Sequence, residues 1–183
     1  MTFENFKELY KASTLKEVEK ATVLYHATYK DCLKSILEKG LLTDSSEFWH
    51  AEKNEDSKLY FAFDAGDAVE WAELGKPEQE EWLVNMEYDT ETPDITESPV
   101  VVLAVNISGL DADSIVPDDI LCEDMYEDDE METCVTTCAY TKDIPADKLY
   151  ICDITSDEYL KPMVKLSSIT DVDELDSKFM VED

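Results

Sequence analysis

Apolar residues in the first part of the chain recur at two different periods, which separate helices from strands. In the N-terminal segment 1–22 they recur every three or four positions, which predicts a helical segment. Residues 23–28 form a short apolar run and predict a strand, and the helical period that follows ends at Gly40, as helices commonly do. A second strand over 59–63, followed by a second helical pattern, repeats this order.

The second half of the chain contains more strand patterns than helix patterns. The continuous apolar run over 100–105 predicts a strand that is buried on both faces. Acidic residues dominate 122–132, which is typical of a loop, and strands are expected over 133–141 and 149–154. We expect a C-terminal helical extension over 155–183. Together these elements predict an α+β fold in which the 183 residues form a single domain.

The charge of the chain narrows its possible partners. Forty-five acidic residues outnumber 15 lysines, the chain has no arginine, and its formal net charge is −30. Such a surface repels phosphates and anionic lipids, so we expect no direct binding of nucleic acid or membranes and instead expect a basic protein partner. An alternative is that the charge serves solubility alone. An odd number of scattered cysteines, five, predicts reduced thiols and a cytoplasmic protein.

The sequence lacks the common motifs that bind phosphate or carry out hydrolysis. Its four glycines cannot form a P-loop or the glycine-rich turn of a dinucleotide fold, and neither HExxH nor GxSxG occurs. We expect no metal site. His26 is the main candidate for chemistry, because the small residues Ala27 and Thr28 after it would let a ligand approach the backbone. The alternatives are a hydrogen-bonded core histidine at position 26 and a plain core residue at Tyr60.

Two strand–helix pairs resemble the start of the ADP-ribosyltransferase superfamily. Residues 24–28 read Leu-Tyr-His-Ala-Thr, and residues 36–41 read Ile-Leu-Glu-Lys-Gly-Leu. In the family the first strand typically reads aromatic-His-Gly-Ser/Thr, and its helix ends in Ile-Leu-x-x-Gly-Leu. Residues 59–62 read Leu-Tyr-Phe-Ala, and Trp71 follows Tyr60 by eleven positions. This is similar to the poly(ADP-ribose) polymerase and diphtheria-toxin branch, which has a second aromatic residue at that spacing.

Two later stretches extend the resemblance. Residues 100–118 are similar to a central strand and turn of many small members, and 133–150, with an Asp-Ile-Pro turn, resemble their late strand pair. The resemblance implies an ADP-ribosyltransferase-like fold with two small packed antiparallel sheets and flanking helices. It also implies that NAD⁺ lies in a cleft between these sheets.

The resemblance assigns roles to particular residues. His26 would hydrogen-bond the adenosine ribose, the backbone at Ala27 and Thr28 would hold the carboxamide, and Tyr60 and Trp71 would flank the nicotinamide ring. A glutamate at the start of a late strand would stabilise the oxocarbenium-like state. Glu132 is the first choice for this role and Glu130 the second, which makes Glu132, His26 and Tyr60 the expected catalytic residues.

Two departures from the family pattern refine the functional prediction. Ala27 stands where the family has glycine, which narrows the expected pocket. The absence of arginine argues against the arginine-serine-glutamate branch and against the RNA 2′-phosphotransferases. We expect a mono-ADP-ribosyltransferase that modifies a basic protein, as a phage or bacterial effector does. The alternatives are an NAD⁺ glycohydrolase and a catalytically inactive acidic protein that mimics nucleic acid and blocks a basic partner.

Overall fold

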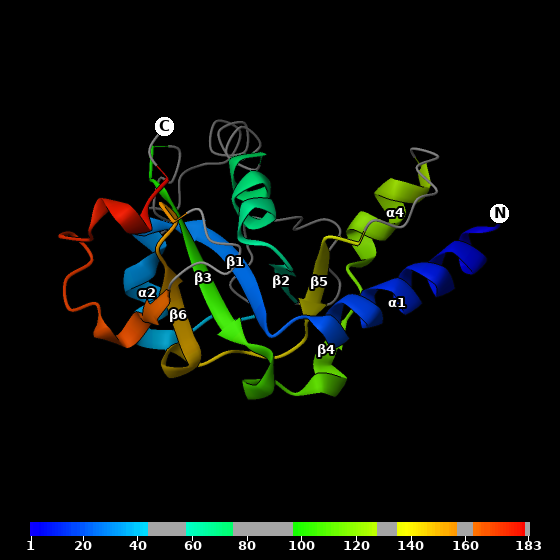
Figure 1. The fold of residues 1–183 in the computed structure, drawn as a ribbon, viewed down its shortest axis with the longest axis horizontal. Coiled ribbons are helices and arrows are strands. Elements are labelled where there is room, and N and C mark those ends of the chain that lie inside the picture. The colour runs from blue at the N-terminus through cyan, green and yellow to red at the C-terminus, as the bar shows by residue number, and fades with distance from the viewer. Residues whose placement is uncertain (44–57, 75–96, 128–134, 157–162, 182–183) are drawn as a thin grey trace, which may run out of the picture.

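The protein has a mixed α/β fold built on one open antiparallel sheet (Figure 1). A computed structural model describes residues 1–43, 58–74, 97–127, 135–156 and 163–181. The described strands lie side by side in the order β4-β5-β2-β1-β3-β6-β7. Their bounds are β1 Val23–Tyr29, β2 Leu59–Ala62, β3 Val100–Asn106, β4 Ile115–Val116, β5 Thr137–Tyr140, β6 Leu149–Cys152 and β7 Met163–Lys165.

The sheet is uneven in how its strands are joined. All of β1 pairs with all of β3, from Val23 opposite Asn106 to Tyr29 opposite Val100. By contrast, β1 pairs with β2 only at Tyr25 and Ala62. The described strands therefore form two half-sheets, β4-β5-β2 and β1-β3-β6-β7, which meet at a single residue pair. The family resemblance implied two separate packed sheets, but the described strands belong to one sheet.

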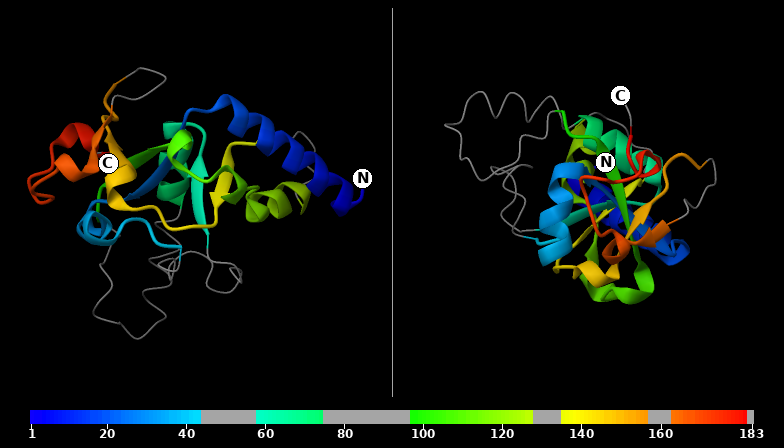
Figure 2. Two further views of the ribbon diagram at one scale, coloured as in Figure 1. Left: turned by 90° about the horizontal axis from the view of Figure 1, so that it is seen from below. Right: turned by 90° about the vertical axis from the view of Figure 1, so that its left-hand side faces the viewer.

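Each face of the sheet is covered by different segments. On one face, Leu24, Leu103 and Phe61 pack with α2, Leu33–Lys39, and with the C-terminal residues Leu166 and Phe179. The other face is covered by a helix over residues 65–74. Alanines of this helix pack against Tyr25, Val102 and Ala104 of the sheet, which brings its backbone close to the strands. The two views in Figure 2 show how the segments surround the sheet.

Helices α1, Phe3–Lys20, and α4, Asp119–Glu127, extend away from the sheet on the side of β4 and β5 (Figure 1). Thr2 caps α1, since its hydroxyl accepts a hydrogen bond from the Asn5 N–H. The two helices share a buried cluster that includes Phe6, Tyr10 and Met125. The N-terminal helix predicted from the sequence is therefore present, and it packs against α4.

Two segments differ from the sequence prediction. Residues 122–132 were expected to be a loop because of their acids, but α4 continues to Glu127, since Cys122 and Met125 give it a buried apolar face. In place of a C-terminal helical extension, the described residues form β7 and two short 3-10 turns, at Leu166–Ser168 and Ser177–Phe179. Strand β7 pairs with β6, so this segment is an edge strand of the sheet.

Candidate functional site

The candidate site lies where β1 and β2 separate. In a strand, the peptide groups of successive residues point alternately to the two neighbouring strands. At the two ends of β1 the even-numbered residues face the β3 side, since the Thr22 carbonyl accepts a hydrogen bond from the Ile107 N–H and the Lys30 N–H donates to the Pro99 carbonyl. The odd-numbered residues between them therefore face β2. Tyr25 has its partner there, Ala62, but Ala27 has no register partner in β2. The peptide groups of Ala27 that point toward β2 are thus outside the ladder.

We call the stretch beyond Tyr25 and Ala62, where β1 and β2 have no register partners, the opening, and the side chain of His26 bonds across it. Its Nδ1 lies 2.8 Å from the carbonyl oxygen of Tyr60, a contact that joins the two strands through a side chain instead of a backbone pair. Because a carbonyl only accepts hydrogen bonds, Nδ1 must carry the proton. In the neutral ring Nε2 is then an acceptor. The ring of His26 also packs against Phe61, with 5.6 Å between the ring centroids.

The surroundings of His26 favour its neutral form. Burial lowers the pKa of His26 below its ordinary value, and the bond to the Tyr60 carbonyl opposes this effect only in part. A neutral ring at physiological pH fixes one donor, Nδ1, and one acceptor, Nε2. The ring can therefore hold the carbonyl of β2 and accept a hydrogen bond from a ligand hydroxyl at the same time.

The residues after His26 lie on opposite faces of β1, as alternation in a strand requires. Ala27 packs beneath the helix over residues 65–74, near Val69 and Ala72. Its methyl group thus contributes to the core, while its backbone remains outside the β1–β2 ladder. Thr28 is half-buried and lies on the same face of β1 as His26.

Tyr60 lies on the β2 face opposite Phe61 and close to several charged groups. Burial raises the pKa of Tyr60 to about 12, and the carboxylates of Asp118 and Asp119 add to the rise. Lys58, two residues earlier, bonds to Asp119 with 3.1 Å between Nζ and Oδ2. Tyr60 is therefore a neutral hydroxyl donor beside an acidic pair.

Asp118 is a buried carboxylate that the sequence analysis did not select as a site residue. Its Oδ1 accepts hydrogen bonds from the N–H groups of Ile120 and Leu121 at 3.1 Å, which caps α4. Its Oδ2 accepts a hydrogen bond of 2.9 Å from the hydroxyl of Thr137, the first residue of β5. Burial still raises the pKa of Asp118. The Asp-Asp pair that precedes an apolar helical period could have identified this cap.

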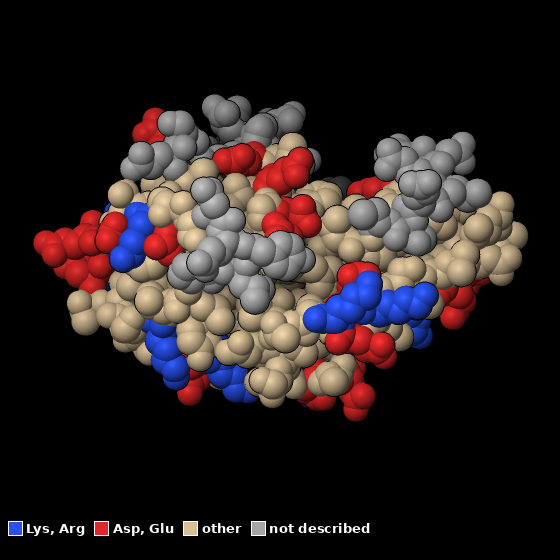
Figure 3. Space-filling model, in the orientation of Figure 1, with Lys and Arg blue, Asp and Glu red and all other residues tan. Residues whose placement is uncertain are grey.

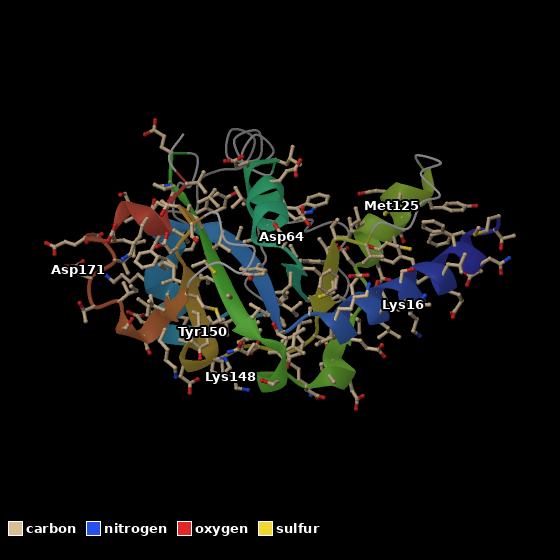
Figure 4. All side chains as sticks on the ribbon, in the orientation of Figure 1. Lys16, Asp64, Met125, Lys148, Tyr150 and Asp171 are labelled. Atoms are coloured by element: carbon tan, nitrogen blue, oxygen red, sulfur yellow. The ribbon has the colours of Figure 1, made fainter. Side chains whose placement is uncertain are left out.

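The helix over residues 65–74 begins directly after β2 and carries Trp71. Asp64 starts the helix, because its Oδ1 accepts a hydrogen bond of 2.7 Å from the Gly66 N–H (Figure 4). The Tyr29 hydroxyl donates to the Ala72 carbonyl at 2.8 Å and anchors the other end. Trp71 itself is 40% exposed. No ring contact joins it to Tyr60 in the described part of the chain.

The structure thus brings together only some of the predicted residues. It places His26 against the backbone of Tyr60, with Ala27 and Thr28 beside it. Glu132 and Glu130 lie outside the described residues, so their predicted catalytic role stays a prediction. Within the described ranges, no three His, Cys, Asp or Glu side chains are grouped so that they could hold a metal ion.

Comparison with known proteins adds no relative to this picture. Neither a protein-family model, nor a curated protein, nor a solved structure matches the chain. Separately, none of the described helices combines the length and apolar character that a membrane span requires. The functional argument therefore depends on the geometry around β1 and β2.

Proposed function

We propose that the chain is a mono-ADP-ribosyltransferase of the family it resembles, which uses NAD⁺ to modify a basic protein as a phage or bacterial effector. The observation that carries this proposal is the opening between β1 and β2, spanned by the His26 side chain. The two strands that carry the resemblance are neighbours in the sheet. In this proposal, the half-sheets correspond to the two small sheets of the ADP-ribosyltransferase fold.

Three features of the described residues support NAD⁺ binding, with His26 contributing from one face of the sheet and Tyr60 from the other. The Ala27 peptide groups that lie outside the ladder can bond a carboxamide, which needs one donor and one acceptor. His26, with its proton on Nδ1, can accept a hydrogen bond from a ribose hydroxyl at Nε2. Tyr60 and Trp71 provide aromatic faces for the nicotinamide ring.

The remaining chemistry belongs to a carboxylate. When bound, NAD⁺ supplies an electrophilic ribose carbon and nicotinamide as the leaving group. Glu132 would bond the adjacent ribose and stabilise the positive charge that develops there. The acidic surface, at a formal net charge of −30, would draw a basic target toward the site. Cys32, Cys122 and Cys138 are free thiols, in keeping with a cytoplasmic location.

One observation favours a second candidate, an acidic protein without catalysis that blocks a basic partner. Asp118 and Asp119, the carboxylates that influence Tyr60, are both held by other groups. Asp118 is bonded to Thr137 and Asp119 to Lys58. The described residues therefore offer no free carboxylate beside Tyr60, and activity depends on Glu132 or Glu130.

Nicotinamide release separates these candidates. The purified protein is incubated with NAD⁺ labelled in the adenylate group, with and without a purified basic protein, beside His26→Ala, Glu132→Gln and the control Glu123→Gln. Glu123 is an exposed residue of α4. We expect release and labelled acceptor for the wild type and the control, loss of NAD⁺ binding in His26→Ala, and binding without turnover in Glu132→Gln.

Other results would redirect the assignment. Release without labelled acceptor would identify a glycohydrolase. Neither release nor NAD⁺ binding by the wild type would refute the transferase and favour the acidic binder. Loss of turnover in Glu123→Gln as well would show that the assay responds to the overall charge and not to the site. Thermal unfolding of each variant checks that the fold is intact.

A further inference from the structure

The outer surface of the helix over residues 65–74 has no partner in the described structure. Ala65, Ala68 and Ala72 are buried against the sheet. On the opposite side, Asp67, Glu70, Trp71 and Leu74 are three or four positions apart, so their side chains are neighbours on one helix face. Trp71 is 40% exposed and Leu74 is 60% exposed. This outer face therefore combines two carboxylates with two large apolar side chains.

The charges of this outer face are not balanced. Residues 59–74 contain four acids and no lysine, and none of these acids forms an ion pair within the described residues. Helix α1, in contrast, has four glutamates and four lysines, and Lys20 pairs with Glu17. In Figure 3, carboxylates gather over the helix after β2 with no lysine beside them, while lysines on this side of the molecule lie over α1, along the lower edge and at the left end.

The stability of the helix does not account for these acids. Asp64 and Asp67 lie at the start of the helix, where the helix dipole favours negative charge, but Glu70 and Glu73 lie beyond the first turn, where it gives them no support. Asp67 has a raised pKa, caused first by burial and then by repulsion from Asp64 and Glu70. A cation from outside the chain would relieve this repulsion.

We propose that the outer face formed by Asp67, Glu70, Trp71 and Leu74 is a docking surface for a basic amphipathic segment of another protein. The indole of Trp71 is the best aromatic partner for an arginine or lysine cation, and Asp67 and Glu70 provide opposite charges next to it on the helix. Leu74 extends the contact to an apolar side chain of the partner. Nucleic acids and anionic lipids are unsuitable partners, because the surface would repel their phosphates.

The position of this surface connects it with the candidate site. The helix starts directly after β2, the strand that carries Tyr60. A segment docked on the outer face would therefore lie on the helix that follows the strand of Tyr60 and packs over Ala27. In the choice of a basic partner the inference rests on the proposed function, but docking itself needs neither NAD⁺ nor Glu132.

The test measures binding of a defined peptide without NAD⁺. The probe is a fluorescent peptide of arginine and leucine at helical spacing, followed by anisotropy. We expect Asp67→Asn/Glu70→Gln and Trp71→Ala/Leu74→Ala each to weaken binding about tenfold. The matched controls are Glu4→Gln/Glu8→Gln, which removes the same charge from α1, and Leu9→Ala/Leu15→Ala, whose leucines are 50% and 46% exposed. Controls should stay within about twofold of the wild type.

Two results would overturn the proposal. If the α1 charge control weakens binding as much as Asp67→Asn/Glu70→Gln, the peptide responds to net charge alone. If Trp71→Ala/Leu74→Ala binds like the wild type, the apolar half of the surface has no role. Because NAD⁺ is absent, peptide binding without nicotinamide release in the separate assay would refute the transferase and leave the docking surface intact. The reverse result would refute the docking surface alone.

Discussion

The two edges of β1 differ in how they are joined to the rest of the sheet. The edge toward β3 is closed by pairing along the whole strand, whereas the edge toward β2 is paired only at Tyr25 and Ala62. A buried peptide group without a partner costs stability, so an opening inside a sheet persists only where something else satisfies those groups. Here the His26 ring satisfies the Tyr60 carbonyl. The edge toward β3 is therefore joined by backbone pairs along the whole strand, whereas the edge toward β2 is joined by one backbone pair and one side-chain contact.

A second link joins the connections that run between the half-sheets, one from β1 to β2 and the other from β5 to β6. The segment between β5 and β6 passes α2, where Leu41 and Ile144 exchange two backbone hydrogen bonds of 2.9 Å. Gly40 permits this approach. It has a φ of +84°, and a Cβ at this position would lie 2.3 Å from the Ile144 carbonyl oxygen. The Tyr25–Ala62 pair and the Leu41–Ile144 pair are therefore two joins between the parts of the molecule that carry the half-sheets.

The largest effect should come from the closed edge. Leu103 is fully buried, lies opposite His26 in the register, and belongs to the largest core cluster. We expect Leu103→Ala to lower the free energy of unfolding by about 3 kcal/mol, through lost burial and a residual cavity. Urea denaturation measures this change. Val164→Ala, at a 42% exposed position of β7, should stay within about 0.5 kcal/mol of the wild type. A loss below about 1 kcal/mol for Leu103→Ala would contradict this view of the closed edge.

The second join should respond to a single methyl group. In Gly40→Ala the new Cβ meets the Ile144 carbonyl, and the positive φ is strained for alanine. We expect the free energy of unfolding to fall by about 2 kcal/mol. Gly109→Ala is the matched control, because a Cβ there meets nothing within 4 Å, and it should be nearly neutral. Equal effects of the two substitutions in urea denaturation would rule out a structural role for the Gly40 contact.

A smaller effect is expected where α4 is fastened to the β5 half-sheet. Asp118→Ala removes the cap of α4 and the acceptor of the Thr137 hydroxyl, which should cost about 1–2 kcal/mol. Asp118→Asn keeps an oxygen acceptor and should be closer to the wild type. Thermal unfolding of the two variants checks the order. If alanine and asparagine destabilise the protein equally, the hydrogen bonds to Asp118 do not fasten α4.

The smallest effect belongs to the open edge and depends on pH. The lowered pKa of His26 means that the unfolded chain takes up a proton below about 6.5 while the folded protein does not. The stability contributed by neutral His26 is therefore complete above about pH 6.5 and is lost as the pH falls toward the folded pKa. We expect His26→Asn to cost about 1 kcal/mol at neutral pH and less at acidic pH.

The pH prediction is measured as a difference between two proteins. The unfolding free energies of the wild type and His26→Asn are determined by urea denaturation across the acidic range. Subtraction removes the contribution of other titrating groups, among them Asp118, whose raised pKa acts in the opposite direction. A difference that stays constant or grows on acidification would show that His26 is not held neutral at the open edge.

The elements that depend on local periodicity and on the composition of a single segment could be predicted from the sequence. The helix in segment 1–22, the strands at 23–28 and 59–63, the buried strand from Val100 and the helix end at Gly40 are all present. Each has a period or a cap that the chain carries locally.

Other features could not be predicted, because they depend on residues that are distant in the sequence and meet only in the folded protein. Residues 119–127 are helical because Cys122 and Met125 meet α1, although their acidic neighbours favour a loop. Residues 163–165 are a strand because β6 offers an unpaired edge. The bond from His26 to the Tyr60 carbonyl joins residues 34 positions apart. The period of the apolar residues shows which face of an element is buried. It does not show which element packs against that face, because the packing partner comes from another part of the sequence.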